Sequence, residues 1–355
     1  MSLNRDLAVL FASSHFPPAK RLRACDPMAG TGVRTARYLL ETSNIASIVA
    51  GDNDRAATEL VRQTVRINGL EDRATVLRSD AHTLLSQHSK DRFDLIDLDP
   101  FGSPAPFFES ALRATSTGGV IAATATDMGP LSGARPSACL RKYGVSSIRT
   151  EFEKEFAVRV LASSLMSAAS RLELGITIAF THATDHYART YAIVTKGRKE
   201  ANQSLNYFGY VVYCPKCLYR VETYSVSAIP NKCANCGAAT KAGGPFWVGP
   251  LWERQTVEAM IHHTPTLLSS RLNQVQRMLG LIEGEAGLPR FYYTTDSVAS
   301  VYHVKPRSVV SLVESLRAGG FQASRTHFNP AGFRTNAPFP SIVASFQTRP
   351  EKAQP

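Results

Sequence analysis

The amino-acid sequence predicts an α/β protein with a Rossmann-like, doubly wound parallel sheet and a smaller α+β part toward the C-terminus. Three observations predict this class. In the first half of the chain, short apolar strands alternate with helical patterns, which is the order of βαβ folds. A glycine turn lies between the first strand and the first helix, as nucleotide-binding sheets require. In the second half, two pairs of cysteines stand among aromatic residues.

The strands of the sheet are expected where apolar runs end before a polar residue, at 22–26, 45–51, 75–77, 93–98 and 119–125. Helical spacing predicts intervening helices at 36–41, 58–68 and 106–115. A longer amphipathic helix is expected at 152–169. The apolar runs 175–180 and 191–195 then suit a hairpin that closes the sheet.

The second domain is expected over residues 201–355, because the polar stretch around Lys199 ends the pattern of the first, 1–200. Its helical spacing runs from Glu258 to Leu281. Residues 294–320 suit two further helices joined around Val304 to Pro306, and a short strand or ribbon with Phe321 and Phe328 follows. That order resembles a winged helix-turn-helix.

The charge of the chain points to a polyanionic partner. The formal net charge is +11; residues 1–204 hold 25 Lys/Arg against 21 Asp/Glu, and residues 205–355 hold 15 against 8. The second half is therefore expected to hold such a partner more strongly, although charge that serves only solubility is the alternative. Neither a membrane-spanning run nor a signal-peptide pattern is recognisable, so a cytoplasmic protein is expected.

The turn after the first strand suits a nucleotide-like cofactor. Asp26 ends the strand, Gly30 and Gly32 form the turn, and Arg34 opens the helix. Asp52 stands at the end of the next strand, where a carboxylate can accept hydrogen bonds from ribose hydroxyls. A dinucleotide would need a third glycine and a bare helix N-terminus for its pyrophosphate.

S-Adenosylmethionine fits that turn better, because it carries a sulfonium and a carboxylate in place of phosphate. Asp26 could face its cationic groups, and Arg34 its carboxylate. Asp80, followed by Ala81 after the third strand, could reach an adenine amino group. A helix N-cap is the alternative for Asp80.

The cysteines Cys214, Cys217, Cys233 and Cys236 form two CxxC pairs with the spacing of a zinc ribbon. Four thiolates leave no open coordination position, so a structural zinc ion is expected. Redox use of one pair is the alternative.

The stretch 93–104, FDLIDLDPFGSP, brings an acid, a proline and an aromatic ring to one strand end. Asp99 would stand at the ligand-binding edge of the sheet. The Pro100 carbonyl could accept a hydrogen bond, and the Phe101 ring could stack on a planar substrate. This set suits chemistry on a ring amino group, whereas a plain strand-ending turn is the alternative.

Together these residues resemble the tRNA guanine-26 N2-dimethyltransferases over nearly the whole chain. The matching motifs are NRDLAV at 4–9, DPMAGTGVRTARYLLE at 26–41, DLIDLDPFGSPAPF at 94–107, ATDMGPLSG at 125–133, the four cysteines and HFNPAGFRTNAP at 327–338. The resemblance implies a class I methyltransferase domain that methylates the exocyclic N2 of guanine 26 in tRNA, once and then twice, from S-adenosylmethionine. Because the second half carries more of the excess positive charge, we expect the zinc-ribbon and winged-helix part, 201–355, to bind the tRNA through its phosphates.

The same resemblance carries over Arg5, Arg34, Asp52, Asp80 and Ala81 as cofactor-binding positions, and Asp99 as the catalytic carboxylate. It departs at the start, where the family has a longer segment with an aromatic-Asn-Pro motif before NRDLAV. A truncated or misassigned start, or another aromatic in that wall of the pocket, is therefore expected. Binding or activity could suffer accordingly.

Three other functions compete with this interpretation. A nicotinamide oxidoreductase would show the third glycine and no DPFG strand end. An adenine- or DNA-directed methyltransferase could use a similar acid-proline-aromatic turn on an amino group. A non-enzymatic zinc-ribbon RNA-binding protein would explain the charge and the cysteines but not the first domain. No membrane partner and no obligate protein partner is expected.

Overall fold

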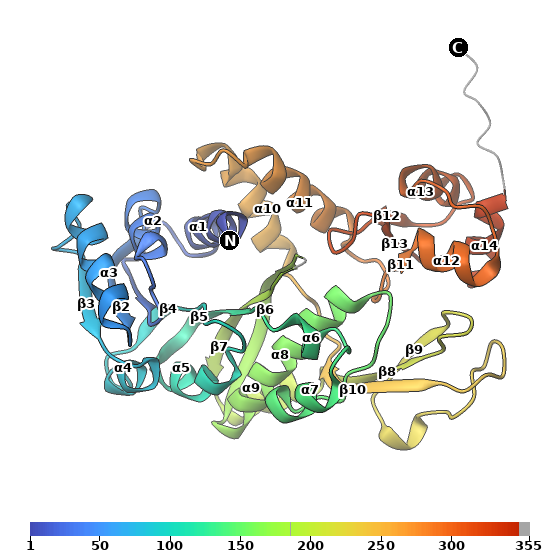
Figure 1. Ribbon diagram of the computed structural model, residues 1–355, viewed down its shortest axis with the longest axis horizontal. Helices are drawn as coiled ribbons and strands as arrows, with labels where there is room; N and C mark the ends of the chain where they lie inside the picture. The colour runs from blue at the N-terminus through green and yellow to red at the C-terminus, as the bar shows by residue number, and fades with distance from the viewer. Residues whose placement is uncertain (185, 348–355) are drawn as a thin grey trace, which may run out of the picture.

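A computed structural model describes residues 1–184 and 186–347. Its largest sheet has seven strands in the order β3-β2-β1-β4-β5-β7-β6. Strands β1 to β5 pair in parallel, and β7 runs antiparallel to both of its neighbours. The predicted Rossmann-like sheet with its closing hairpin is confirmed, and the sheet occupies the blue-to-green half of Figure 1.

The strands of this sheet are β1 Leu22–Asp26, β2 Ile45–Asp52, β3 Ala74–Arg78, β4 Phe93–Leu98, β5 Thr115–Ala125, β6 Leu174–Ala183 and β7 Ala188–Lys196. The helices around it are α1 Ser2–His15, α2 Val33–Glu41, α3 Arg55–Ile67, α4 Ala81–Gln87, α5 Phe108–Ala114, α6 Met128–Leu131, α7 Pro136–Tyr143, α8 Glu153–Arg171 and α9 Arg198–Leu205. The polar stretch around Lys199 is thus helical, and α9 packs against β6 and α8.

Two large hydrophobic clusters lie one on each face of the sheet, and among the described residues a third, small cluster contains Cys214, Cys217 and Cys233. Alternate residues of β5 point to opposite faces, as pleating requires: Val120 and Ala122 join one cluster, Ile121 and Ala123 the other. The first cluster includes α1, α2 and α3, and the second includes α4, α5 and α8. The sheet is therefore covered on both faces, as its nearly continuous apolar strands predict.

Helices α10 Arg254–His263 and α11 Leu272–Gly284 return to the first face of the sheet, where α10 packs against α1 (Figure 1). The continuous helix expected from Glu258 to Leu281 is wrong. The α-helix breaks after His263, and a short 3-10 turn, Thr264–Thr266, holds Pro265. Proline lacks the N–H that a helix interior needs, and its ring clashes with the preceding turn.

The C-terminal part contains two small sheets. Strands β8 Phe208–Tyr213, β9 Arg220–Thr223 and β10 Lys241–Trp247 form one, beside the cysteines. The other sheet combines β11 Tyr293–Thr294, β12 Ala323–Arg325 and β13 Gly332–Thr335 with helices α12 Thr295–Tyr302, α13 Val309–Ala318 and α14 Phe339–Gln347.

This second group has the helix-helix-ribbon order that the sequence predicts. Phe328 lies in the loop between β12 and β13, within the ribbon as expected, whereas Phe321 precedes β12. The division of the chain into residues 1–200 and 201–355 stays a prediction. No helix among the described residues is both long and apolar enough to cross a bilayer.

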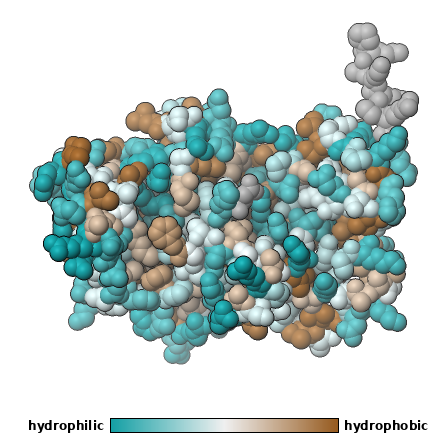
Figure 2. All heavy atoms as spheres, viewed as in Figure 1, coloured by the Kyte–Doolittle hydropathy of each residue, from teal (hydrophilic) through white to brown (hydrophobic). Residues whose placement is uncertain are grey.

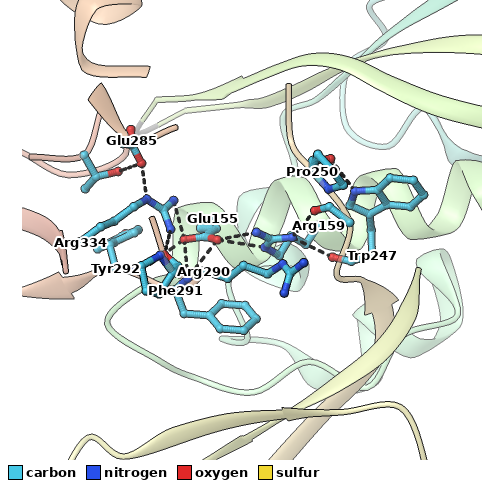
Figure 3. A network of polar contacts seen from close by, with 12 residues as sticks. Glu155, Arg159, Trp247, Pro250, Glu285, Arg290, Phe291, Tyr292 and Arg334 are labelled. Atoms are coloured by element: carbon cyan, nitrogen blue, oxygen red, sulfur yellow. Dashed lines mark hydrogen bonds and ion pairs between the residues drawn. The ribbon is translucent and has the colours of Figure 1, made fainter. Parts of the chain in front are cut away.

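A buried network of charges joins α8 to the C-terminal elements (Figure 3). Glu155 of α8 pairs with Arg159 at 2.7 Å and with Arg334 of β13 at 2.8 Å. Arg334 also pairs with Glu285, and the backbone N–H of Phe291 donates to Glu155 Oε1 at 3.1 Å. Burial would raise the pKa of Glu155, but Arg334 and Arg159 outweigh burial and lower that pKa to about 2. The carboxylate is thus ionised, as a buried bridge between two guanidinium groups requires.

Candidate active site

The glycine turn after β1 is held by the carboxylate at the end of β2. Gly30 donates its N–H to Asp52 Oδ2 at 2.9 Å, and the Asp54 N–H donates to Oδ1 at 2.9 Å. Gly30 and Gly32 have φ of 57° and 75°, in the left-handed region that favours glycine. A Cβ on Gly32 would also lie 3.1 Å from the Val61 Cα. The turn is therefore preshaped, and it lies beside the carboxylate expected to bind ribose.

Asp26 lies buried at the end of β1, beside this turn. Its Oδ2 accepts a hydrogen bond from the Thr35 hydroxyl at 2.9 Å. Burial raises the pKa of Asp26 to about 7, although Arg34 acts in the opposite direction. A carboxyl group with this pKa gains its charge readily when a cation comes close.

Arg34 is the centre of a polar cluster and not a free side chain. Only 7% of the side chain is exposed. Its guanidinium donates to Asn4 Oδ1 at 3.1 Å, to Asp97 Oδ2 at 3.1 Å and to Asp99 Oδ2. Burial would lower the pKa of Arg34, but Asp97 and Asp99 raise it. Arg34 therefore connects the cofactor turn directly to the predicted catalytic carboxylate.

Asp97 lies beneath Arg34 and joins it to a second guanidinium. Its two oxygens accept from Arg189 of β7 at 3.0 and 2.7 Å, and Oδ2 also accepts from the Tyr38 hydroxyl at 2.6 Å. Arg189 donates in addition to Thr124 Oγ1. Burial would raise the pKa of Asp97, but Arg189 and Arg34 outweigh it and lower that pKa.

The network of Arg34, Asp97 and Arg189 was not predicted from the sequence. Its one signal there is Asp97, an aspartate two positions before Asp99 in an otherwise largely apolar strand. In a strand, residues i and i+2 face the same side, which is why both aspartates reach Arg34. Arg189 comes from a strand on the far side of β5, and no local pattern announces that contact.

Arg5 of α1 also lies near this cluster. Burial and the neighbouring Arg34 and Arg37 lower its pKa, whereas Asp99 acts to raise it. Within residues 1–184 and 186–347, its guanidinium makes no ion pair or hydrogen bond. The donors of Arg5 are therefore free for an anionic group, whereas both terminal nitrogens of Arg34 already have partners.

The turn after β4 presents a ring to solvent. Asp99 keeps 16% of its side chain exposed, and Phe101 is fully exposed. Gly102 has φ of 89° and is fixed by Thr126, whose hydroxyl accepts from the Gly102 N–H at 2.7 Å and whose own N–H donates to the Gly102 carbonyl at 2.9 Å. The turn is thus a rigid support for an exposed aromatic side chain.

Asp80 occupies the N-cap of α4, where its Oδ1 accepts from the Thr83 N–H at 3.0 Å. This is the alternative that the sequence left open for it. Ala81 is buried behind it. The predicted contact of both residues with an adenine ring stays a prediction.

The four cysteines come together as the spacing predicts. Their sulfur atoms all lie within 4.8 Å of one another, and the Cys214–Cys236 and Cys217–Cys233 Sγ distances are both 3.5 Å. A tetrahedral zinc site, with Zn–S bonds of about 2.3 Å, separates its sulfurs by about 3.8 Å. The cluster therefore fits a zinc ion with four thiolate ligands.

Comparison with known proteins decides the family. The family model described as N2,N2-dimethylguanosine tRNA methyltransferase matches residues 1–347. This chain belongs to that family. The tRNA (guanine(26)-N(2))-dimethyltransferase of Methanosphaera stadtmanae is 32% identical to it, over 96% of this chain and 88% of the relative. The tRNA (guanine(26)-N(2)/guanine(27)-N(2))-dimethyltransferase of Aquifex aeolicus is 30% identical, over 98% and 88%.

Among solved structures, Trm1 from Pyrococcus horikoshii in complex with S-adenosyl-L-methionine matches with a TM-score of 0.87 at 30% identity. The match covers 97% of this chain and 92% of that one. Family and fold class are thus confirmed. The role of each site residue stays a prediction.

Proposed function

We propose that this protein methylates the exocyclic N2 of guanine 26 in tRNA, using S-adenosylmethionine, to give N2-methylguanosine and then N2,N2-dimethylguanosine. The observation that carries the proposal is the turn after β4. Asp99 faces the cofactor turn through Arg34, and Phe101 stands fully exposed two residues later. An acid and a ring are thus presented to a planar amino-bearing base at the ligand-binding edge of the sheet.

The cofactor would be held by residues around the glycine turn. When bound, it supplies a methyl group on a cationic sulfonium. Asp26 would face its cationic groups, and Asp52 its ribose hydroxyls. Arg5 would bind its carboxylate, because the guanidinium of Arg34 is already shared between Asp97 and Asp99. Asp80 and Ala81 would border the adenine.

The target amino group is a weak nucleophile, because its lone pair is delocalised into the guanine ring. One amino hydrogen would bind Asp99 and the other the Pro100 carbonyl, so that nitrogen directs its lone pair at the methyl group. Arg34 contacts Oδ2 of Asp99, and the amino group can then approach Oδ1. Phe101 would stack on the base after the base leaves the helix.

Each turn of the reaction forms one N–C bond, breaks one S–C bond and releases one proton from N2. Asp99 is the nearest acceptor for that proton. After the first transfer, the methylamino group must rotate so that its remaining hydrogen faces the acceptor. The pocket therefore needs room beside Asp99, which the exposed turn provides.

The C-terminal part would bind the tRNA, and the four cysteines would hold a structural zinc ion. The fit of the sulfur atoms to a tetrahedral ion supports the zinc site. No open coordination position is left for chemistry, so the metal would stabilise the ribbon. A cytoplasmic location accords with a tRNA substrate.

The variant Asp99→Asn tests the catalytic assignment. We expect methyl transfer to fall by about 100-fold or more, since the anionic acceptor is lost, whereas S-adenosylmethionine affinity measured by calorimetry should hold. Asp94→Asn is the matched control, because Asp94 lies near the start of β4, the strand that leads to Asp99, and pairs with Lys20 instead of Arg34. Near-normal turnover of Asp99→Asn would overturn the assignment.

A further inference from the structure

We propose that the outer face of α7 and its flanking loops binds phosphates of the tRNA next to the target guanine. This surface, called here the α7 surface, comprises Arg135, Arg141, Lys142 and Arg149. The inference rests on the proposed function, since it places the RNA relative to the methylation site.

The α7 surface is tied to the turn that carries Phe101. Thr126 binds Gly102 through two hydrogen bonds. The next residue, Asp127, accepts hydrogen bonds from the Tyr143 hydroxyl and, at 2.8 Å, from Lys142 Nζ, both at the end of α7. A single dipeptide therefore holds both the target turn and the helix.

Helix α7 is anchored firmly enough to act as a fixed surface. Cys139 and Tyr143 are buried in the hydrophobic cluster that also contains α8, and α6 and α7 lie beside α8 in Figure 1. Gly133 packs so closely that an added Cβ would lie 2.2 Å from the Ile148 carbonyl oxygen. The charges on the outer face are thus presented on a rigid element.

Lys142 pairs with Asp127, but among the described residues the three arginines of the α7 surface have no acidic partner. The chain has no Asp or Glu between residues 128 and 150. Arg135, Arg141 and Arg149 are exposed. Within residues 1–184 and 186–347, none of these three guanidinium groups makes an ion pair or hydrogen bond. Unpaired arginines on a rigid surface suit phosphate oxygens, which they bind with two parallel hydrogen bonds.

Exposed arginines elsewhere often have a carboxylate one helical turn away. Arg62 pairs with Glu59, Arg113 with Glu109 and Arg254 with Glu258. In the view of Figure 2, hydrophilic residues cover most of the surface, and hydrophobic ones form small separate areas. The protein surface is therefore broadly polar. The α7 surface differs from the rest in its link, through Thr126 and Asp127, to the turn that carries Phe101.

The test is the triple variant Arg135→Gln, Arg141→Gln, Arg149→Gln. Its control replaces Arg21, Arg92 and Arg171, three exposed arginines that precede β1, β4 and β6 and so lie at the opposite edge of the sheet. Both triples remove three positive charges. Any difference between them therefore reports position and not net charge.

Binding and turnover are measured with an unmodified tRNA transcript at several salt concentrations. For the α7 triple, we expect the slope of log affinity against log salt to fall by about 2, since each lost phosphate contact removes roughly 0.7 to 0.9. The KM for tRNA should rise on the order of tenfold, with kcat and cofactor affinity unchanged. The control triple should change this slope by well under the roughly 0.7 to 0.9 that one phosphate contact contributes.

Equal effects of the two triples would overturn the α7 surface while leaving the proposed function intact. A lower kcat with unchanged tRNA affinity would also overturn it, because a phosphate contact acts on binding. Failure of the parent protein to methylate the transcript would instead count against the proposed function itself.

Discussion

The buried pairing of Asp97 with two arginines leads to a stability prediction for Asp97→Asn. The substitution keeps the shape of the side chain but removes its charge and turns one acceptor into a donor. Arg189, which is fully buried, would then face an amide N–H₂ at one of its two contacts. Removing one partner of such a pair leaves a buried charge uncompensated and costs about 4 kcal/mol.

That cost can be converted into a melting temperature. Unfolding entropy is about 2.1 cal/mol/K per residue, or about 0.75 kcal/mol/K for this chain. A loss of about 4 kcal/mol therefore predicts a Tm about 5 °C below that of the parent. Scanning calorimetry or thermal scans followed by circular dichroism at pH 7 will measure it.

The pH dependence of the effect has a defined sign. Because the pKa of Asp97 is lowered in the folded protein, its contribution is fully present above the unfolded pKa of about 4 and is lost as the pH falls through the folded pKa. The gap between parent and variant should therefore shrink only below about pH 4. A Tm within 1 °C of the parent at pH 7 would contradict a stabilising role for the Asp97 charge. The same holds if Arg189→Met, added to Asp97→Asn, fails to recover part of the loss.

Two further predictions concern ligands. Binding of the cationic cofactor should favour ionised Asp26, whose pKa is raised to about 7. The parent should therefore bind S-adenosylmethionine about tenfold more weakly at pH 6 than at pH 8, as measured by calorimetric titration. Asp26→Asn should show a smaller pH dependence of this affinity, and equal pH profiles for the two proteins would contradict the contact. Removal of the metal with a strong chelator should release one zinc ion per chain and lower the Tm. Cys236→Ser should weaken the retention of zinc. Metal analysis that finds no zinc in freshly purified protein would contradict the zinc site.

Much of the fold could be predicted from local patterns. Strands β1 to β5 could be recognised in the sequence because each contains a short apolar run that ends at or just before a polar residue. Helix α1 was not predicted, since most of its residues are buried and its apolar positions leave no clear polar face. The break near Pro265 was missed because helical spacing resumes after it.

Part of the candidate site could also be predicted from local patterns, and part could not. The sequence places Asp26, Asp52 and Asp99 at one edge of the sheet, because the carboxyl ends of parallel strands meet there. The partners of Arg34 could not, because Asn4 and Asp97 come from distant parts of the chain and meet it only in the folded sheet. The sequence pattern predicts that Arg34 binds the cofactor carboxylate, whereas in the structure its two terminal nitrogens donate to Asp97 and Asp99.

Mass spectrometry of nucleosides will show whether this protein dimethylates guanine 26 of tRNA. The purified protein is incubated with S-adenosylmethionine and an unmodified tRNA transcript that carries guanine at position 26, and in parallel with the same transcript carrying adenine there. We expect N2-methylguanosine followed by N2,N2-dimethylguanosine in the first transcript and neither product at that position in the second. Methylation of adenine, or equal methylation of both transcripts, would contradict it.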